Sequence, residues 1–251
     1  MNTERCSETM TAAGERAPAS RRPAVSIVVP VLDEGDGLVE RLRELQAWRR
    51  QGAELVVVDG GSRDRSAELA APLADRLVRA PRGRGRQMNA GAAIARGDLL
   101  LFLHADTRLP PTALAAIGAA RAAGAQWGRF DVRIDGTLAG LALVALMMNW
   151  RSRLTGIATG DQAIFVTREA FDRVGGFPEI ALMEDIAFCR RMRRESPPAC
   201  LREKVVTSGR RWQQHGLLRT ILLMWRLRWR FHFGADPDEL ARVYGYLPDE
   251  R

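Results

Sequence analysis

The chain alternates between short apolar runs and stretches in which apolar residues recur every three or four positions. The run at 99–103 ends at His104 and Asp106, and the run at 54–58 leads directly into Asp59. Uninterrupted apolar runs of this length indicate strands that are buried on both faces, as in parallel sheets. Because ligands of open α/β sheets gather at the carboxyl ends of strands, we expect these polar side chains to form part of a site.

The first hundred residues repeat this alternation of strand and helix, which predicts a mostly parallel sheet with right-handed crossovers. A helix over 36–49 is predicted by four apolar residues at helical spacing: Leu38, Leu42, Leu45 and Trp48. The other elements predicted in this half are strands at 25–29 and 76–78 and helices at 63–73 and 87–95.

The second half is less regular. A strand is expected at 126–134, where apolar and charged residues alternate. The segment 138–150 is apolar on all sides, which predicts a buried helix. The remaining elements expected here are strands at 163–166 and 204–207 and helices at 184–194, 217–233 and 238–244.

Length and composition limit the class of protein. The 251 residues, 46% of them hydrophobic, are enough for one substantial core. Three cysteines without ligand-like spacing argue against a disulfide framework and favour a reducing cytosol. No run approaches the roughly 18 apolar residues of a membrane span.

The pattern along the chain predicts three parts. Residues 1–22 mix charged and small residues without the apolar block of a signal peptide, so we interpret them as a disordered leader. Residues 23–209 form the α/β domain. Residues 210–251 form an amphipathic helical extension.

The net charge of +8 is carried almost wholly by arginine. It favours an anionic partner, which could be a nucleic acid, a phosphate-bearing substrate or an acidic membrane, although an Arg-rich proteome explains it as well. A non-enzymatic protein that binds RNA or lipid is one alternative, but it leaves the acids at the strand ends without a purpose. A sugar nucleotidyltransferase is another, but it would place a glycine-rich turn directly after the first strand, where this chain has Pro30 to Glu34.

Several short motifs occur in an order that resembles glycosyltransferase family 2, whose members have the GT-A fold. The resemblance covers about residues 25–194, and its motifs lie at 25–34, 57–62, 86–91, 97–98, 104–106, 159–162, 175–177 and 184–185. It implies a GT-A-like α/β fold, with a mixed, mostly parallel sheet flanked by helices and with C-terminal helices. It also implies an enzyme that transfers a sugar from a nucleotide-sugar donor, UDP-linked in our interpretation, to an acceptor hydroxyl with inversion.

The resemblance assigns the donor side to the first half of the chain. Asp59 is expected to contact a uracil-type base, with Glu34 near the ribose or the base, although an Asp-Gly sequence is also typical of a plain turn. The residues expected to bind the nucleotide sugar are Pro30, Leu32, Glu34, Asp59, Gly61, Arg86, Asn89, His104 and Asp106.

A divalent cation, Mn²⁺ or Mg²⁺, is the expected cofactor, because it stabilises the charge that grows on a diphosphate leaving group. Hard cations prefer oxygen ligands, and Asp106 supplies one. The family usually has an aspartate where this chain has His104, whose imidazole either serves as a second ligand or contacts the ribose or a phosphate. The alternative for Asp106 is a cap for the helix that follows Pro110.

The loop at 82–86 places three arginines beside the start of a predicted helix. Guanidinium groups and free backbone N–H groups both suit phosphate oxygens. We favour Arg86 as the ligand of the donor phosphates over Arg82 and Arg84. A solvated loop, or one that touches nucleic acid, is the alternative.

The acceptor side is assigned to Gly160, Asp161 and Gln162 and to the pair Glu184 and Asp185. By resemblance, Asp185 is the general base that takes the proton of the acceptor hydroxyl, and Glu184 orients the acceptor. Acids in the first turn of a helix are also stabilised by the helix dipole alone, so a purely structural role stays open.

The segment 217–233 interleaves apolar and aromatic residues with arginine. It fits an amphipathic helix on anionic lipid, or a helix that packs on the core while its Arg stems reach solvent. We therefore expect a cytoplasmic protein, with peripheral attachment to the inner face of the cell membrane as a further expectation. The expected partners are a nucleotide-sugar donor, an acceptor for which lipid-linked compounds are one class, and an anionic membrane surface, with no nucleic acid.

Overall fold

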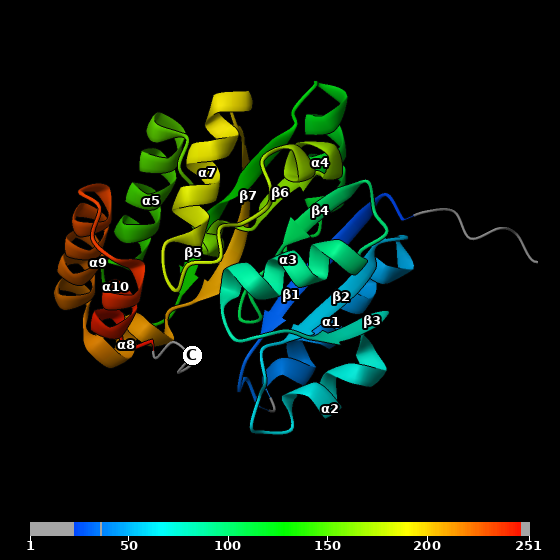
Figure 1. Cartoon of the computed structure of the whole chain (residues 1–251), viewed down its shortest axis with the longest axis horizontal. Helices are drawn as coiled ribbons and strands as arrows, with labels where there is room; N and C mark the ends of the chain where they lie inside the picture. The colour runs from blue at the N-terminus through cyan, green and yellow to red at the C-terminus, as the bar shows by residue number, and fades with distance from the viewer. Residues whose placement is uncertain (1–22, 36, 247–251) are drawn as a thin grey trace, which may run out of the picture.

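A seven-stranded sheet forms the centre of the molecule in the computed structural model, which describes residues 23–35 and 37–246 (Figure 1). The predicted leader at 1–22 lies outside the described residues. The strand order is β3-β2-β1-β4-β6-β5-β7. The strands are β1 (Val25–Val31), β2 (Glu54–Asp59), β3 (Arg76–Arg79), β4 (Leu99–Phe102), β5 (Trp127–Asp135), β6 (Ile164–Thr167) and β7 (Ala199–Ser208).

The sheet is mixed but mostly parallel, which confirms the predicted fold class. Strands β3, β2, β1 and β4 run parallel to one another. Strand β6 is antiparallel to both of its neighbours, β4 and β5, while β7 is parallel to β5. The carboxyl ends of β1, β2 and β4 therefore meet at one edge of the sheet. Asp59 and Asp106, which follow the apolar runs of β2 and β4, lie at this edge as predicted.

Helices cover both faces of the sheet. The helices are α1 (Gly37–Arg50), α2 (Ser66–Ala70), α3 (Arg84–Ile94), α4 (Ala113–Ala122), α5 (Leu141–Thr155), α6 (Arg168–Arg173), α7 (Glu184–Glu195), α8 (Arg210–His215), α9 (Leu217–His232) and α10 (Pro237–Tyr244), with short 3₁₀ turns at Ala71–Leu73 and Gly160–Gln162. Helices α1, α4 and α5 pack in one hydrophobic cluster, and α3, α6 and α7 pack in another. Successive strand residues alternate between these clusters, since Val28 belongs to one and Val29 to the other.

The predicted buried helix at 138–150 is wrong in its burial. Helix α5 buries only Leu141, Ala145, Asn149 and Ser152, which recur at helical spacing against the sheet. Its opposite face carries five apolar residues that are 50–66% exposed: Leu143, Leu146, Met147, Trp150 and Leu154. The prediction fails because the sheet covers only one face of α5, and no other described element covers the opposite apolar face.

Helix boundaries differ from the prediction at one functionally important place. Helix α3 begins at Arg84, earlier than the predicted start at residue 87, because Gly83 adopts a φ of 135° and its carbonyl accepts a hydrogen bond from the N–H of Gln87 at 2.9 Å. Arg84 therefore lies on the first turn of a helix rather than in a loop. Two short helices, α6 and α8, are not predicted by the apolar pattern.

The C-terminal helices pack against the start of α7. Leu227 of α9 and Leu240 of α10 are fully buried in a third cluster together with Leu182 and Ile186. The face of α9 that contains Leu227 thus packs on the core, which is one of the two arrangements that the sequence of 217–233 allows. The proposed division of the chain at 209/210 stays a prediction.

The opposite face of α9 is open to solvent. Five apolar residues along it are 66–74% exposed: Leu218, Leu222, Trp225, Trp229 and Phe233. In the part of the chain that the structure describes, no helix combines the length and the hydropathy that crossing a bilayer needs.

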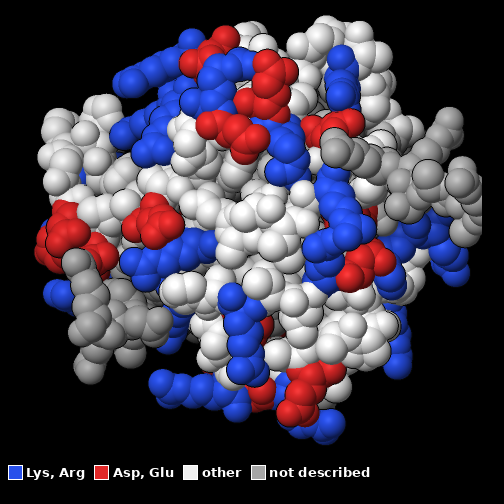
Figure 2. Space-filling model, turned by 45° about the vertical axis from the view of Figure 1, so that its right-hand side comes forward, with Lys and Arg blue, Asp and Glu red and all other residues white. Residues whose placement is uncertain are grey.

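The charged residues are mixed on the face that Figure 2 shows. Lysine and arginine side chains stand among aspartate and glutamate side chains there, with uncharged surface between them. The excess positive charge of the chain does not form a single continuous patch on this face.

Candidate active site

Two cavities meet at the edge where β1 and β4 end. The smaller has a volume of about 240 Å³ and is lined by Pro30, Val31, Leu32, Glu34, Arg84, Gln87, His104, Ala105, Asp106 and Tyr246. The larger, of about 560 Å³, extends between α1 and the end of β7. Both are lined by Glu34, Ala105 and Asp106, so these residues stand at the junction of the two cavities.

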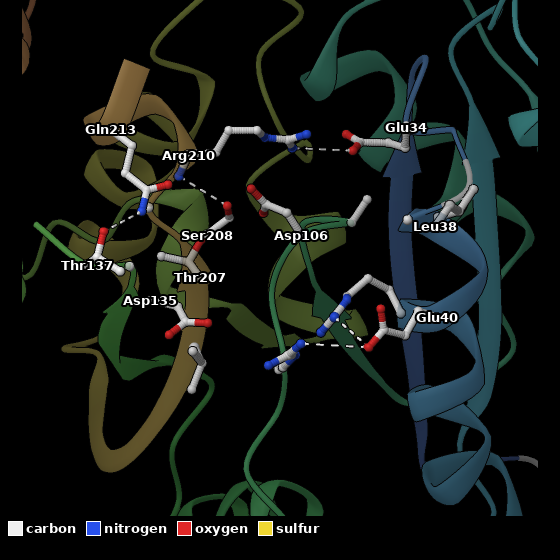
Figure 3. A pocket seen from close by; sticks show the side chains of 17 residues that line it. Glu34, Leu38, Glu40, Asp106, Asp135, Thr137, Thr207, Ser208, Arg210 and Gln213 are labelled. Carbon is white, nitrogen blue, oxygen red and sulfur yellow. Dashed lines mark hydrogen bonds and ion pairs between the residues drawn. The ribbon is translucent and has the colours of Figure 1, made fainter. Parts of the chain in front are cut away.

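The junction brings two carboxylates together. Figure 3 shows Asp106 in the middle of the larger cavity, between Glu34 on one side and Thr207 and Ser208 on the other. Burial raises the pKa of Glu34, and the nearby negative charge of Asp106 raises it further. Arg210 partly offsets this effect, with its Nη2 3.9 Å from Oε2 of Glu34.

These two carboxylates fit a divalent cation. Within the described residues no cluster of three or more metal-ligating side chains occurs. Mg²⁺ is nevertheless commonly held by one or two carboxylates, with substrate phosphates completing its shell. Asp106 and Glu34 supply this donor set beside a cavity, and a cation between them would relieve the repulsion that raises the pKa of Glu34.

His104 lies between the donor cavity and the acceptor side. Its Nδ1 lies 3.3 Å from Oδ1 of Asp161, and its Nε2 lies against Gly160, where a side chain would collide with the ring. Burial lowers the pKa of His104, but the hydrogen bond and the charge of Asp161 outweigh burial and leave it raised. The imidazole is thus held by the predicted acceptor-side segment, and its role as a metal ligand stays a prediction.

Glu184 and Asp185 open α7, as the sequence predicts, but their surroundings differ. Glu184 is buried and forms an ion pair with Arg84, whose Nε lies 3.3 Å from its Oε1. Asp185 is half-buried, and its Oδ2 accepts a hydrogen bond from the N–H of Gly160 at 2.9 Å. Both acids line a very small cavity that also includes His104 and Gly160, so the predicted acceptor-side residues lie together.

Asp59 ends β2 and is completely buried. Its Oδ1 accepts a hydrogen bond from the N–H of Ser62 at 3.1 Å, which is typical of a turn. Its Oδ2 is buried and forms no hydrogen bond within the described residues, although Nε of Arg79 lies 3.6 Å away. Asp59 lines neither of the two cavities, and its contact with a base stays a prediction.

Three amides in the predicted motifs hold the backbone around the site. Nε2 of Gln87 donates to the carbonyls of Val31 and Val58, at 2.9 and 3.0 Å, and so ties the ends of β1 and β2 together. A side chain on Gly60 would lie within 2.9 Å of Gln87, which explains the glycine there. Gln87 is a site residue that the sequence analysis did not single out.

Asn89 and Gln162 also use their amides within the protein. Asn89 donates to the carbonyl of Phe177 at 2.8 Å and accepts from its N–H at 2.9 Å, which joins α3 to the segment that precedes α7. Gln162 is fully buried, and its Nε2 donates to Ser152 at 3.0 Å. The predicted roles of both residues toward ligands stay predictions, while the structure gives each a role in positioning neighbouring segments.

The arginine that lines the donor cavity is Arg84 rather than Arg86. Arg86 is exposed, and its Nε lies 3.4 Å from Glu179 at the surface. Gly61 is exposed as well, with a φ of 86°, and lines neither of the two cavities. Helix α3 begins at Arg84, so Arg84 lies on the first turn of the helix. The sequence alone, with 82–86 interpreted as a loop, favours Arg86 over Arg84.

Backbone strain coincides with the site. Three residues other than glycine have a positive φ in the described part of the chain: Asp33, Ala163 and Met183. Asp33 precedes Glu34, Ala163 follows the acceptor-side turn, and Met183 precedes Glu184. Such conformations cost free energy and persist mostly where the surrounding structure enforces them, often at active sites.

The family of the chain follows from a comparison with known sequences. The model of the family described as glycosyl transferase family 2 matches residues 26–162, which is more than half of the chain. The chain therefore belongs to glycosyl transferase family 2.

Curated relatives share part of the chain. An undecaprenyl-phosphate 4-deoxy-4-formamido-L-arabinose transferase of Pseudomonas paraeruginosa is 40% identical over 98 residues, which are 35% of this chain and 29% of the relative. The protein of the same name in Pseudomonas aeruginosa is 33% identical over 145 residues, 53% of this chain and 41% of the relative. The chain thus matches less than half the length of these relatives.

Solved structures share the fold at low sequence identity. A mannosyltransferase from Pyrobaculum calidifontis, solved with GDP-Man and Mn²⁺, is similar with a TM-score of 0.60 and 20% identity over 90% of this chain and 70% of that one. Staphylococcus aureus TarS, solved with UDP, has a TM-score of 0.59 and 19% identity over 73% of this chain and 60% of that one. The described chain has the GT-A fold of these proteins.

Proposed function

We propose that this protein transfers a sugar from a nucleotide-diphosphate donor, UDP-linked in our interpretation, to an acceptor hydroxyl with inversion. The observation that carries the proposal is the pair Glu34 and Asp106 at the junction of two cavities, with Asp185 on the neighbouring acceptor side. Family membership supports sugar transfer over the nucleotidyl-transfer and non-enzymatic alternatives.

The donor side is formed by the ends of β1, β2 and β4. Asp59 would contact the base from the end of β2, as the resemblance implies, and Arg84 would face the diphosphate from the first turn of α3. Asp106 and Glu34 would hold a divalent cation, with His104 as the further ligand that the resemblance implies. When bound, Mn²⁺ or Mg²⁺ stabilises the negative charge on the departing diphosphate; structures of similar fold were solved with Mn²⁺.

The acceptor side supplies the base. The N–H of Gly160 holds Oδ2 of Asp185 and would orient the carboxylate to take the proton of an attacking hydroxyl. Glu184 is buried against Arg84, so it positions the start of α7 and links it to the donor side. Direct contact of Glu184 with the acceptor remains part of the proposal.

We further propose a lipid-linked acceptor and peripheral attachment to the inner face of the membrane. The exposed apolar face of α9 and its arginines fit an anionic lipid surface. The exposed apolar face of α5 adds a second such surface. The names of the curated relatives, which are undecaprenyl-phosphate transferases, support an acceptor of this class.

Donor binding tests the proposal directly. In isothermal titrations of UDP and GDP with and without Mn²⁺ or Mg²⁺, we expect a cation to strengthen binding and UDP to be preferred. Asp106→Asn should abolish the effect of the cation, whereas the matched change Asp172→Asn, at an exposed position in α6, should not. A chain whose nucleotide binding is unaffected by cations and by Asp106→Asn would refute the assigned donor site.

A further inference from the structure

Two arginines lie on the acceptor side without an anionic partner of their own. Arg151 extends from α5 and Arg228 from α9, and both are close enough to Asp185 for its charge to act on them. Among the described residues neither guanidinium forms an ion pair or a hydrogen bond with a carboxylate, and Nη2 of Arg151 is buried without any hydrogen bond.

The two helices that carry these arginines run side by side (Figure 1). At their beginnings, a side chain on Gly140 would lie 2.7 Å from Leu217, so the first turns touch. Further along, Arg151 and Arg228 are near enough for each to repel the other's charge. Gly140 and Leu217 are separated by the same number of residues as Arg151 and Arg228. Helices α5 and α9 therefore run parallel, and the two arginines lie at the seam between them.

Neither arginine of the seam is in direct contact with a carboxylate among the described residues. Arg84 is paired with Glu184, and His104 with Asp161. The charge of Asp185 acts on both Arg151 and Arg228, and that of Asp161 acts on Arg228 as well, but Oδ2 of Asp185 already accepts the N–H of Gly160. Burial and the neighbouring Arg228 lower the pKa of Arg151 to about 10, and burial lowers that of Arg228, so burial disfavours the positive charge on each guanidinium. Such charges are costly unless an anion compensates them.

We infer that Arg151 and Arg228 bind a phosphate group carried by the acceptor, at the seam between α5 and α9 beside Asp185. The inference rests on the proposed function in placing the acceptor there. Planar guanidinium groups bind phosphate oxygens through pairs of hydrogen bonds, and two of them match a dianion better than a single carboxylate. The exposed apolar faces of the same two helices border this seam, so the phosphate of a lipid and that of a small soluble ester are both sterically reasonable sources.

Phosphate binding to the full chain tests this inference. Inorganic phosphate is titrated calorimetrically into the protein with UDP and Mg²⁺ present, so that the donor site is filled. Arg151→Gln and Arg228→Gln should each weaken binding by about tenfold or more, because each removes a charge-assisted hydrogen bond. The control Arg226→Gln, exposed on the same helix, should change it by no more than about twofold. Equal binding by all four chains, or equal loss in Arg226→Gln, overturns the site.

Folding and the source of the phosphate are controlled separately. Thermal unfolding checks that each variant is folded. Arg228→Lys keeps the positive charge, so it should retain part of the phosphate affinity even where Arg228→Gln fails to fold. Glycerol phosphate and farnesyl phosphate in detergent are then tested as competitors: competition by the second alone identifies a lipid phosphate, and by the first a soluble ester. If neither competes with inorganic phosphate, the acceptor role is refuted. Failure of UDP to bind would refute the proposed function without altering the phosphate result.

Discussion

Nε of Arg84 lies 3.3 Å from Oε1 of Glu184, and this ion pair joins the first turn of α3 to the first turn of α7. This contact joins the donor side to the acceptor side through residues a hundred positions apart in the chain. Burial raises the pKa of Glu184, Arg84 opposes that effect, and the charge of Asp185 adds to it. Without Arg84, a buried carboxylate would face another carboxylate with no cation in contact.

Arg84→Met should destabilise the protein by about 3 kcal/mol at neutral pH, since it leaves Glu184 buried without its partner. Adding Glu184→Gln should recover part of the loss. The control is Arg65→Met, which removes an ion pair with Glu68 whose side chains are both more than 70% exposed, and which should change stability by less than about 1 kcal/mol. Urea unfolding measures all three. Equal stability of Arg84→Met and Arg65→Met would contradict the assigned importance of the pair.

Stability should fall in acid partly because of Asp75, which joins α1 to β2. Burial raises the pKa of Asp75, but hydrogen bonds from Arg49, at 2.9 Å, and from the N–H of Leu55, at 2.8 Å, outweigh it and hold the pKa below its ordinary value of 3.8. The unfolded chain therefore binds the proton more tightly than the folded chain does. The stabilisation is complete above the ordinary pKa and is lost as the pH falls through the folded pKa.

Asp75→Asn should accordingly cost about 1 kcal/mol at pH 7, a value reduced for the partial exposure of the pair. The difference from the parent should shrink as the pH falls below 3.8, the ordinary pKa of the group, and through the lower pKa of the folded chain. Chemical unfolding at several pH values measures it. A difference that persists undiminished in acid would show that the carboxylate charge does not matter.

Gly160→Ala should disturb the site without disturbing the core. A side chain at Gly160 would collide with the ring of His104, while one at Gly118 in α4 would meet nothing within 4 Å. We expect Gly160→Ala to lower turnover by about 10²-fold, because small displacements of catalytic groups have effects of this size. Gly118→Ala should stabilise the protein by about 0.4–1 kcal/mol and leave turnover unchanged. Near-parental turnover in Gly160→Ala would show that His104 and Asp185 tolerate the shift.

The strands of the first half could be predicted because each is a continuous apolar run, and Asp59 and Asp106 were located by the ends of those runs. Helix α5 shows where this reasoning stops: its apolar residues specify a helix, but burial depends on a partner for each face. The sequence favours Arg86 over Arg84, because the effect of Gly83 on the helix start is a property of backbone geometry. Contacts such as that between Asn89 and Phe177 depend on how α3 and the segment before α7 pack, which no local pattern encodes.

Binding to lipid should depend on the exposed aromatic residues of α9. The double change Trp225→Gln and Trp229→Gln removes two side chains that are 66% and 70% exposed, so it should leave the fold intact. It should lower the fraction of protein that floats with anionic liposomes by about tenfold or more. Binding by the parent should also weaken at high salt.

Leu77→Gln, at an exposed apolar position on β3, is the control for a general loss of surface hydrophobicity and should float as the parent does. Absence of flotation by the parent at low salt would exclude a lipid surface as the partner of α9. Equal flotation of the parent and the double variant would place the lipid contact elsewhere.

The chemical step provides the last prediction. Asp185→Asn removes the charge of the proposed base but keeps an oxygen that can accept the N–H of Gly160, so the start of α7 should stay in place. General bases contribute about 10²–10⁴-fold to rate, and turnover should fall by that order while donor binding stays unchanged. Glu184→Gln should reduce turnover less, since that residue is buried against Arg84. The measurements are steady-state transfer to an identified acceptor and donor titration, with Asp172→Asn as the control. If Asp185→Asn turns over at the parental rate, Asp185 only caps the start of α7, and Asp161, which lies beside His104, becomes the residue to test as the base.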